Sequence, residues 1–392
     1  MESLPAVIAR TPAYGGGSIV NLISSVIAAA GGEAAYPPLD RLDGKALEPA
    51  RHIVLLVADG LGADLLAAAP GAAALRAAAA GSITSVFPPT TATAVTALLT
   101  GLAPQQHGLT GWFMFFRALG SVISVLPFTT RLGRTSLASA GVDAGRLLGH
   151  TPVFDLVPRR CYSVAPADIA GSAFNRAHTG RAIVRPYSTM EELFAALEAI
   201  VREREPSFTY AYWPEIDRVA HVRGPQHAAV RAEVERLDRA FERFVARARG
   251  TGTATIVTAD HGFVAVEPGR VIRLAEHPLL KQALVLPLCG EPRTAYCYVA
   301  PGREDEFAGY VQSELAHAAL CVPSEALIEH GLFGVGAEHP ELRSRIGTHT
   351  LIMRGGYAIA DELPGERPFD QRGVHGGGSL AEMEVPLVVA LP

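Results

Sequence analysis

Residues 52–58 read HIVLLVA and are followed directly by an aspartate and a glycine. An unbroken run of β-forming, mostly apolar residues is typical of a strand that is buried on both faces. Similar strands are expected at 207–213 (SFTYAYW) and at 253–258 (TATIVT). The acids that follow these three runs are Asp59, Asp217 and Asp260. Because open α/β sheets place their chemistry at the carboxyl ends of their strands, the three acids are candidate functional residues.

Helical patterns lie between the expected strands. Ser188 and Glu191 have the spacing of a capping box, which predicts a helix as far as about Arg204. Apolar residues recur on one stripe within 225–249, and the Ala-rich tract 67–80 also reads as mostly helix. The alternation predicts an α/β fold with a mostly parallel central sheet between helices.

The length and composition favour one large folded domain. The chain has 392 residues, of which 49% are hydrophobic, so it has ample apolar material for a core. We expect a single catalytic domain over 1–392, with a small α+β insertion at about 278–334 that acts as a cap, because the strand and helix pattern changes there. There are 39 acidic and 34 basic residues, and the net charge of −5 provides no general attraction to nucleic acid or to an anionic membrane.

The cysteines and the N-terminal region bear on location. The four cysteines at 161, 289, 297 and 321 have no paired spacing, which favours a reducing compartment and hence a cytoplasmic protein. No run of 18 apolar residues is present in the sequence, so we expect no membrane association through a spanning helix. Residues 18–30 (SIVNLISSVIAAA) faintly resemble a secretion signal, but Asn21 and two serines interrupt the apolar run. We interpret this segment as a surface helix packed on the domain.

Histidines accompany the strand-end acids. His221 follows Asp217 by four residues, which places both on one face of a helix, and His261 follows Asp260 directly. His375 stands near the C-terminus in a glycine-rich turn, GVHGGGS. Carboxylates and imidazoles in this number suit two divalent metal ions, with zinc favoured and manganese or iron as alternatives. Each residue alone is more often a helix cap, a turn former or an ordinary histidine.

A threonine-rich segment, SVFPPTTATAVTALLTG at 85–101, supplies a candidate nucleophile. Thr90 and Thr91 follow two prolines and begin what reads as a helix of small residues. At a helix start, free backbone N–H groups stabilise a developing alkoxide or a bound phosphate. Coordination to a metal would lower the pKa of the hydroxyl further. The alternative interpretation is a plain helix cap followed by threonines that pack against the sheet.

Taken in order, these motifs make the sequence resemble the type I phosphodiesterase/nucleotide pyrophosphatase family of the alkaline phosphatase superfamily. The motifs that carry the resemblance are VADG at 57–60, FPPTT at 87–91, TGLAP at 100–104, HG at 107–108, YWPEIDRVAH at 212–221, TADHG at 258–262 and HGG at 375–377. The resemblance implies an alkaline-phosphatase-like fold, two metal ions and a threonine nucleophile. Counting back nine residues from Thr100 favours Thr91 over Thr90 as that nucleophile. The implied ligands are Asp59, Thr91, Asp260 and His261 for one metal, and Asp217, His221 and His375 for the other.

Two departures from the family pattern concern the substrate. Ala92, Thr93 and Ala94 stand where relatives carry Phe-Pro-Asn, whose Phe helps to stack a nucleobase. Trp112 stands where relatives carry an Asn that holds a phosphoryl oxygen, so a nucleotide as the natural substrate is not supported. The aromatic run 112–116 (WFMFF) is either part of the core or the wall of a pocket for an apolar leaving group.

The function that we expect is metal-dependent hydrolysis of phosphodiester or pyrophosphate bonds in a small-molecule phosphoester, through a phosphothreonine intermediate. A phosphonate or sulfate ester hydrolase is the alternative within the superfamily. Sulfatases need a Cys or Ser in a Cys-x-Pro-x-Arg context, which none of the four cysteines has. A catalytically silent metal-binding or ligand-binding protein is the alternative from a different class.

Overall fold

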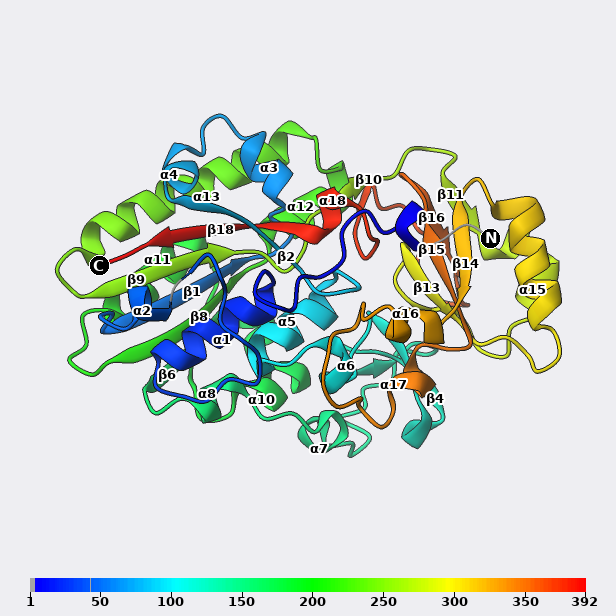
Figure 1. The fold of residues 1–392 in the computed structure, drawn as a ribbon, viewed down its shortest axis with the longest axis horizontal. Helices are drawn as coiled ribbons and strands as arrows, with labels where there is room; N and C mark the ends of the chain where they lie inside the picture. The colour runs from blue at the N-terminus through cyan, green and yellow to red at the C-terminus, as the bar shows by residue number, and fades with distance from the viewer. Residues whose placement is uncertain (1–3, 43) are drawn as a thin grey trace.

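A seven-stranded sheet with helices on both faces forms the larger part of the molecule, and a second sheet lies at one end (Figure 1). The computed structural model describes residues 4–42 and 44–392. The strand order of the larger sheet is β2-β18-β9-β1-β8-β6-β7. Its strands are β1 (His52–Ala58), β2 (Ala79–Thr84), β6 (Arg160–Pro166), β7 (Ile183–Tyr187), β8 (Ser207–Trp213), β9 (Thr253–Thr258) and β18 (Glu384–Ala390).

The central strands of this sheet are those expected from the sequence. Strand β1 is buried at every position and pairs in parallel with β8 on one side and with β9 on the other. Strands β6 and β7 continue the parallel arrangement. Strand β18 runs antiparallel to both of its neighbours, β9 and β2. The prediction of a mostly parallel sheet between helices is confirmed, with this one antiparallel strand.

Two groups of helices cover the faces of the sheet. On one face, α13 (Ala228–Ala248) packs against α3 (Ala63–Ala67), α4 (Ala73–Ala77) and α11 (Met190–Ile200). On the other face, α5 (Thr91–Thr100) packs against α1 (Ile19–Ala29), α8 (Val153–Leu156) and α10 (Ala173–Thr179). Other helices of this part are α2 (Gly44–Leu47), α6 (Pro104–His107), α7 (Ala144–Leu148), α9 (Ala167–Ala170), α12 (Glu215–Arg223) and α18 (Leu380–Met383).

Two helix predictions need correction. Thr189, not Ser188, is the N-cap of α11, because its hydroxyl accepts a hydrogen bond from the Glu192 N–H at 3.2 Å. That helix ends at Ile200, four residues before the predicted end. The Ala-rich tract 67–80 is broken after α3 by Pro70 and Gly71, and its last two residues already belong to β2.

Helix α1 is a core helix, so the prediction of a surface helix is wrong. Ten of its eleven residues are buried. The polar residues that interrupt its apolar run find partners inside the protein: the Asn21 amide donates to the carbonyl oxygens of Tyr14 at 2.8 Å and Pro37 at 2.9 Å. The Ser25 hydroxyl accepts from the Leu39 N–H at 2.8 Å. Satisfied polar groups can be buried at little cost, which the sequence alone did not reveal.

The second sheet is antiparallel and has the order β14-β15-β13-β12-β3-β4-β5. Its strands are β3 (Phe113–Phe116), β4 (Ser121–Ser124), β5 (Thr129–Thr130), β12 (Cys289–Gly290), β13 (Thr294–Cys297), β14 (Ala319–Pro323) and β15 (His349–Met353). The predicted insertion at 278–334 lies in this part, together with strands from 113–130 and 349–353. The two chain segments join where Gly290 of β12 pairs with Phe113 of β3. We name this second sheet and its helices the cap.

Helices and short strand pairs complete the cap. Its helices include α14 (Pro278–Gln282), α15 (Glu304–Tyr310), α16 (Glu325–Glu329) and α17 (Leu342–Arg345). A π-helical turn, Val311–Leu315, continues α15. Two short pairs of strands are β10 (Val264–Ala265) with β17 (Gly373–Val374) and β11 (Val271–Arg273) with β16 (Ala358–Ala360). The second pair lies beside the sheet of the cap (Figure 1), and Ile272 and Ile359 pack in the core of the cap.

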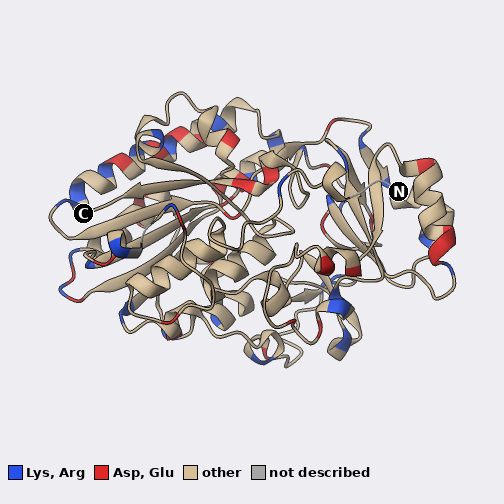
Figure 2. Ribbon diagram, in the orientation of Figure 1, with Lys and Arg blue, Asp and Glu red and all other residues tan. Residues whose placement is uncertain are grey.

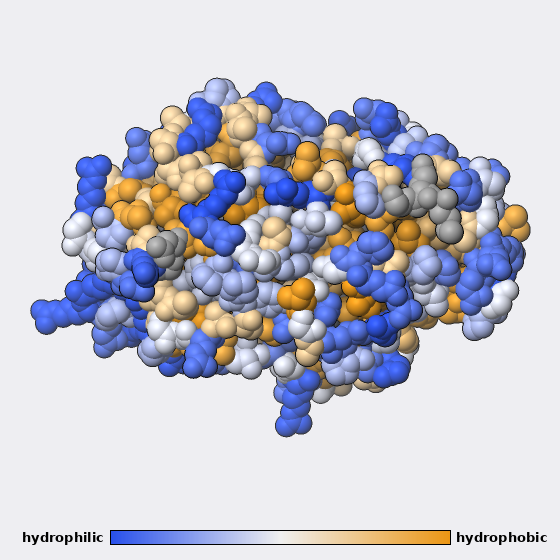
Figure 3. Space-filling view, in the orientation of Figure 1, coloured by the Kyte–Doolittle hydropathy of each residue, from blue (hydrophilic) through white to orange (hydrophobic). Residues whose placement is uncertain are grey.

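Charge and hydropathy follow this architecture. Charged residues lie mainly on outer helices such as α13 and α15 and on loops, whereas the central sheet carries few (Figure 2). On the face shown in Figure 3, hydrophobic residues are interrupted by hydrophilic ones. All four cysteines are free. Among the described residues, no helix combines the length and the apolar character needed to cross a membrane.

Candidate metal centre

The sheet brings the strand-end acids together. Because β1 lies between β8 and β9 and all three run in parallel, their carboxyl ends meet at one edge. Asp59 follows β1, Asp260 follows β9, and Asp217 lies in the first turn of α12, which follows β8. Gly60 has a φ of 74°, and a Cβ there would lie 3.1 Å from the Asp217 Cα, so only glycine allows these segments to approach so closely.

Three buried carboxylate oxygens at this edge have no hydrogen-bond partner among the described residues: Asp59 Oδ1, Asp217 Oδ1 and Asp260 Oδ2. The other oxygens of two of these acids are satisfied. The Tyr212 hydroxyl donates to Asp59 Oδ2, and the N–H groups of Gly60 and His261 donate to Asp260 Oδ1 at 3.1 and 3.0 Å. Buried carboxylates without partners are costly, so this arrangement calls for a cation.

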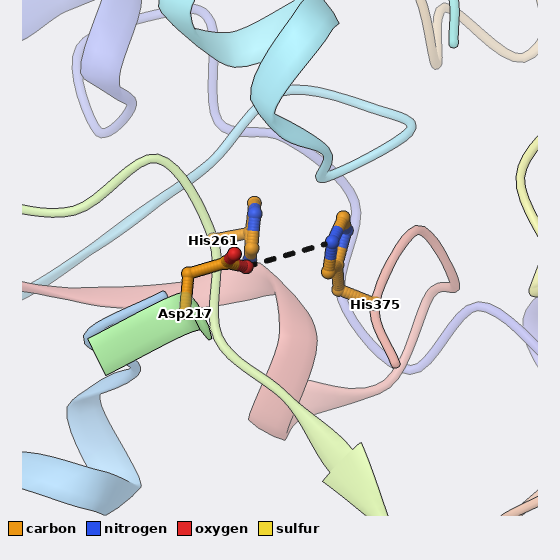
Figure 4. Close-up of side chains that lie close together, drawn as sticks. All are labelled: Asp217, His261 and His375. Atoms are coloured by element: carbon orange, nitrogen blue, oxygen red, sulfur yellow. Dashed lines mark ion pairs between the residues drawn. The ribbon is translucent and has the colours of Figure 1, made fainter. Parts of the chain in front are cut away.

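Imidazole nitrogens face the unpartnered oxygens. His261 Nε2 lies 3.4 Å from Asp59 Oδ1 and 3.6 Å from Asp260 Oδ2. Asp217 Oδ1 lies 3.2 Å from His221 Nε2 and 3.9 Å from His375 Nε2. The close-up in Figure 4 shows Asp217 directed toward His261 and His375. The histidines come from three separate segments of the chain.

The three histidines are all held through the other ring nitrogen. Nδ1 of His221 lies 2.8 Å from the Gly373 carbonyl oxygen, Nδ1 of His261 3.1 Å from that of Gly262, and Nδ1 of His375 3.3 Å from that of Pro89. A carbonyl oxygen can only accept, so each of these contacts needs a proton on Nδ1 and leaves Nε2 on the side of the acids. This is the orientation in which outer hydrogen bonds usually hold metal-ligating histidines.

The donor atoms form two groups that share one residue. Asp59, Asp260 and His261 offer atoms that lie within 4.8 Å of one another, and so do Asp217, His261 and His375. His261 therefore lies between the two groups, whereas the sequence assigned it to the first alone. His221 approaches the second group through its contact with Asp217. Two neighbouring sets of carboxylate and imidazole donors fit a pair of divalent ions such as zinc.

Several ionisable groups lie close together in the buried centre, and this shifts their pKa values. Burial, with Asp217 and Asp260 nearby, raises the pKa of Asp59 well above its usual range. Burial opposes ionisation of Asp217 too, but His221 and His261 outweigh it and lower the pKa of this carboxyl. Burial, together with the two neighbouring imidazoles, holds the pKa of His375 well below its usual range. His375 is thus neutral at pH 7, as a metal ligand must be.

The two candidate threonines have different surroundings. Thr91 is the first residue of α5, and its Oγ1 lies 3.2 Å from His261 Nε2, beside the first group of donors. Thr90 is buried, and its hydroxyl donates to Glu291 Oε1 at 2.7 Å. Because that hydroxyl is committed to Glu291, it does not cap the helix. The geometry favours Thr91 as the residue that faces the donors.

A cavity of ≈ 870 Å³ connects the metal centre with the cap. Thr91, Asp217, His221 and His375 line its inner end. Trp112 and Phe113 form part of its wall, whereas Met114 and Phe116 point into the core. Within β3, Phe113 faces the cavity and Met114 and Phe116 face the core, because alternate residues of a strand face opposite sides. The aromatic run 112–116 thus belongs partly to the cavity wall and partly to the core.

Glu291 and Tyr212 are site residues that the sequence analysis missed. Glu291 lines the cavity and accepts hydrogen bonds on Oε1 from Thr90 and from the Trp112 N–H, the latter at 2.7 Å. Burial raises the pKa of its carboxyl to about 7. Its turn, CGEPR at 289–293, carries no signal that could have identified it, because its partners are about 180 or more residues away in sequence.

Comparisons with known proteins agree with this geometry. The family model described as "Type I phosphodiesterase / nucleotide pyrophosphatase" matches residues 53–377. The chain belongs to this family. A search of curated proteins finds no match.

Three solved structures share the fold. Murine ectonucleotide pyrophosphatase/phosphodiesterase 5 is 19% identical with a TM-score of 0.65, covering 87% of this chain and 88% of that chain. The human protein of the same name is 18% identical with a TM-score of 0.66 and the same coverage. Phosphonoacetate hydrolase from Sinorhizobium meliloti, solved with phosphonoformate, is 19% identical with a TM-score of 0.64, covering 87% of this chain and 90% of that chain.

Proposed function

We propose that the protein is a two-metal hydrolase that cleaves phosphodiester or pyrophosphate bonds through a phosphothreonine at Thr91. The observation that carries the proposal is the set of three unpartnered, buried carboxylate oxygens opposite imidazole Nε2 atoms, with the Thr91 hydroxyl 3.2 Å from one of those atoms. The acids and histidines alone would also suit a metal-binding protein without activity, and it is the Thr91 hydroxyl beside them at a helix start that favours a hydrolase.

The proposed ligands follow the donor groups. Asp59, Asp260, His261 and Thr91 would hold one ion, and Asp217, His221 and His375 the other, with His261 close to both. When bound, a pair of divalent ions lowers the pKa of a hydroxyl, neutralises phosphoryl oxygens and stabilises a leaving alkoxide. Zinc suits this mixture of carboxylates and imidazoles, and manganese and iron are the alternatives.

The chain's own groups position the reaction. The N–H groups of Thr91 and Ala92 make no hydrogen bond within the described part of the chain, so they can donate to a phosphoryl oxygen at the start of α5. Thr91 Oγ1 gives up its proton to solvent and forms a bond to phosphorus while the bond to the leaving oxygen breaks, and the electron pair leaves with that oxygen, which takes up a proton from solvent. Water then attacks phosphorus, the bond to Thr91 breaks, and the threonine hydroxyl is restored.

Known proteins of this fold support the role of the threonine. One structure of the murine protein is of an inactive threonine-to-alanine variant in complex with AMP. Another neighbour is a phosphonoacetate hydrolase, which makes a phosphonate hydrolase the second candidate for this chain. We favour diesters because the nucleophile segment 82–111 contains neither Arg nor Lys, and because Trp112 replaces the family amide. Arg131 lines the cavity, but its guanidinium is engaged by Glu366 at 2.9 Å.

A substrate panel tests the proposal. The protein loaded with zinc or manganese should hydrolyse bis(p-nitrophenyl) phosphate with a higher kcat/KM than p-nitrophenyl phosphate, and chelation should abolish both activities. p-Nitrophenyl phenylphosphonate and phosphonoacetate test the second candidate, and Thr91→Ala controls for contaminating hydrolases. A higher kcat/KM for the monoester would refute the diester preference. Absence of hydrolysis of every phosphorus ester by metal-loaded protein would refute the proposed function itself.

A further inference from the structure

Glu291 reaches the phosphoryl end of the cavity on a tight turn between β12 and β13. Its neighbour Gly290 has a φ of 81°, and a Cβ added at Gly111 would lie 2.7 Å from the Gly290 Cα. These two glycines let the β12–β13 turn approach the segment before β3 so closely that the Trp112 N–H reaches the Glu291 carboxyl group. Glu291 is 92% buried, with 8% of its surface exposed.

The two oxygens of this carboxyl group have different environments. Oε1 accepts both hydrogen bonds, from Thr90 Oγ1 and from the Trp112 N–H, each at 2.7 Å. Oε2 makes no hydrogen bond to residues 4–42 or 44–392, and Glu291 lines the cavity. One oxygen thus anchors the side chain beside the nucleophile, and the other is left for whatever occupies the cavity.

Glu291 contacts two segments that carry residues of the metal centre. Thr90, which anchors Oε1, immediately precedes the proposed nucleophile. On the opposite side, the loop after His375 packs on Glu291, because a Cβ at Gly376 would lie 2.8 Å from the Glu291 Cβ. Glu291 therefore stands between the start of α5 and the loop that carries His375.

Two arginines near Glu291 are paired with other acids. The Arg293 guanidinium, two residues along the chain, is paired with Glu382 at 3.1 Å, and that of Arg131 with Glu366 at 2.9 Å. Burial has the largest effect on the pKa of Glu291 and raises it, and among the other larger effects His221 lowers it and Asp217 raises it. The amide that relatives carry at the position of Trp112 is uncharged, so Glu291 changes the electrostatic character of the phosphoryl site.

We propose that Glu291 determines specificity at the phosphoryl site, admitting phosphorus centres with one negative charge and disfavouring those with two. The inference rests on the proposed function and names its substrate class as monoanionic diesters, phosphonate monoesters included. The free Oε2 is the group that would meet a phosphoryl oxygen, in place of the family amide.

The selectivity is largest when Glu291 is a carboxylate, so the two esters should be compared at pH 9, above its pKa of about 7. As an acid, the carboxyl donates a single hydrogen bond, which one free phosphoryl oxygen satisfies. As a carboxylate, it repels every negative charge nearby, and a dianion is repelled twice as strongly as a monoanion. In both states a monoester dianion gains less from Glu291 than it would from a fixed cation or from several donors.

The test compares Glu291→Gln with the wild-type protein on matched aryl esters. Glutamine keeps the length and the acceptor oxygen for Thr90 and the Trp112 N–H, but it cannot ionise. The ratio of kcat/KM for p-nitrophenyl phosphate to kcat/KM for bis(p-nitrophenyl) phosphate should rise at least tenfold. Glu362→Gln is the matched control: it removes an acid from the same cavity wall, away from Thr90 and Trp112, and should change the ratio less than threefold.

A second variant, Glu291→Met, keeps the test decisive should the glutamine variant fail to fold. It removes the charge with a side chain of similar length, so the ratio should again rise at least tenfold even if both activities fall. A smaller rise in the folded variants, or an equal rise in Glu362→Gln, would overturn the inference. Hydrolysis of both esters by the wild-type protein shows that the proposed function holds independently; hydrolysis of neither would mean that the proposed function has failed.

Discussion

Replacing Thr91 and Thr90 separately with valine should distinguish the nucleophile from its neighbour. Valine keeps the branched shape and removes only the hydroxyl group. Thr91→Val should reduce kcat for a diester by at least ~1,000-fold, since the attacking group is lost. Its stability should stay close to that of the wild-type protein, because Thr91 is only partly buried and its hydroxyl contacts His261 alone.

Thr90→Val should have the opposite profile. The lost hydrogen bond to Glu291 is buried, so about 1–2 kcal/mol of stability should disappear. At ~2.1 cal/mol/K of unfolding entropy per residue, the 392 residues convert this loss into a fall in Tm of about 1–2.5 °C. Glu291 keeps its bond from the Trp112 N–H, so diester kcat should remain within about tenfold of the wild-type value.

Steady-state kinetics, calorimetry and mass spectrometry of acid-quenched reactions would measure these effects. A phosphorylated peptide that contains Thr91 should appear in the wild-type protein and in Thr90→Val, and not in Thr91→Val. If Thr90→Val lost activity and Thr91→Val kept it, the nucleophile would lie one residue earlier. If neither change mattered, the covalent mechanism would be wrong.

Two further predictions concern the metals and pH. The variant His375→Ala should lose mainly the metal held with Asp217, and Asp260→Asn should lose mainly the metal held with Asp59. His261→Ala should lose both metals. Metal analysis would measure these losses, and loss of the same metal in the first two variants would contradict separate sites. Burial lowers the pKa of His150 to about 3 and that of His178 to about 4. Nδ1 of His150 lies 3.0 Å from Nε2 of His178. An unfolded histidine has a pKa near 6.5, so the unfolded chain takes up protons more readily than the folded protein below that pH. The free energy of unfolding is therefore highest above about pH 6.5 and falls toward pH 4, by about 1–2 kcal/mol per histidine at pH 5. Urea unfolding at pH 7 and pH 5 should show this loss, and His178→Gln should reduce it; an unchanged pH dependence in that variant would refute the assignment.

Part of the fold was predictable because its signals are local. A strand that is buried on both faces appears in the sequence as a continuous run of β-forming residues. The bounds of β1, β8 and β9 were therefore predicted correctly. The cap was less predictable, since β3, β4 and β5 join a sheet whose other strands lie more than 150 residues later. Helix α1 was misplaced on the surface because its polar residues are satisfied by partners outside the helix, such as the carbonyl oxygen of Pro37.

The sequence by itself determined the acids, the histidines and the threonines of the two donor groups. Its strand-end acids, its histidines and the two threonines appear in the family order, and the structure brings them together because parallel strands end at one edge of a sheet. Only the tertiary structure decided how they divide. It places His261 within reach of both donor groups, turns the Thr90 hydroxyl to Glu291 and leaves Thr91 facing the donors. It also brings Glu291 from a distant turn, since such contacts depend on chain packing that no spacing in the sequence encodes.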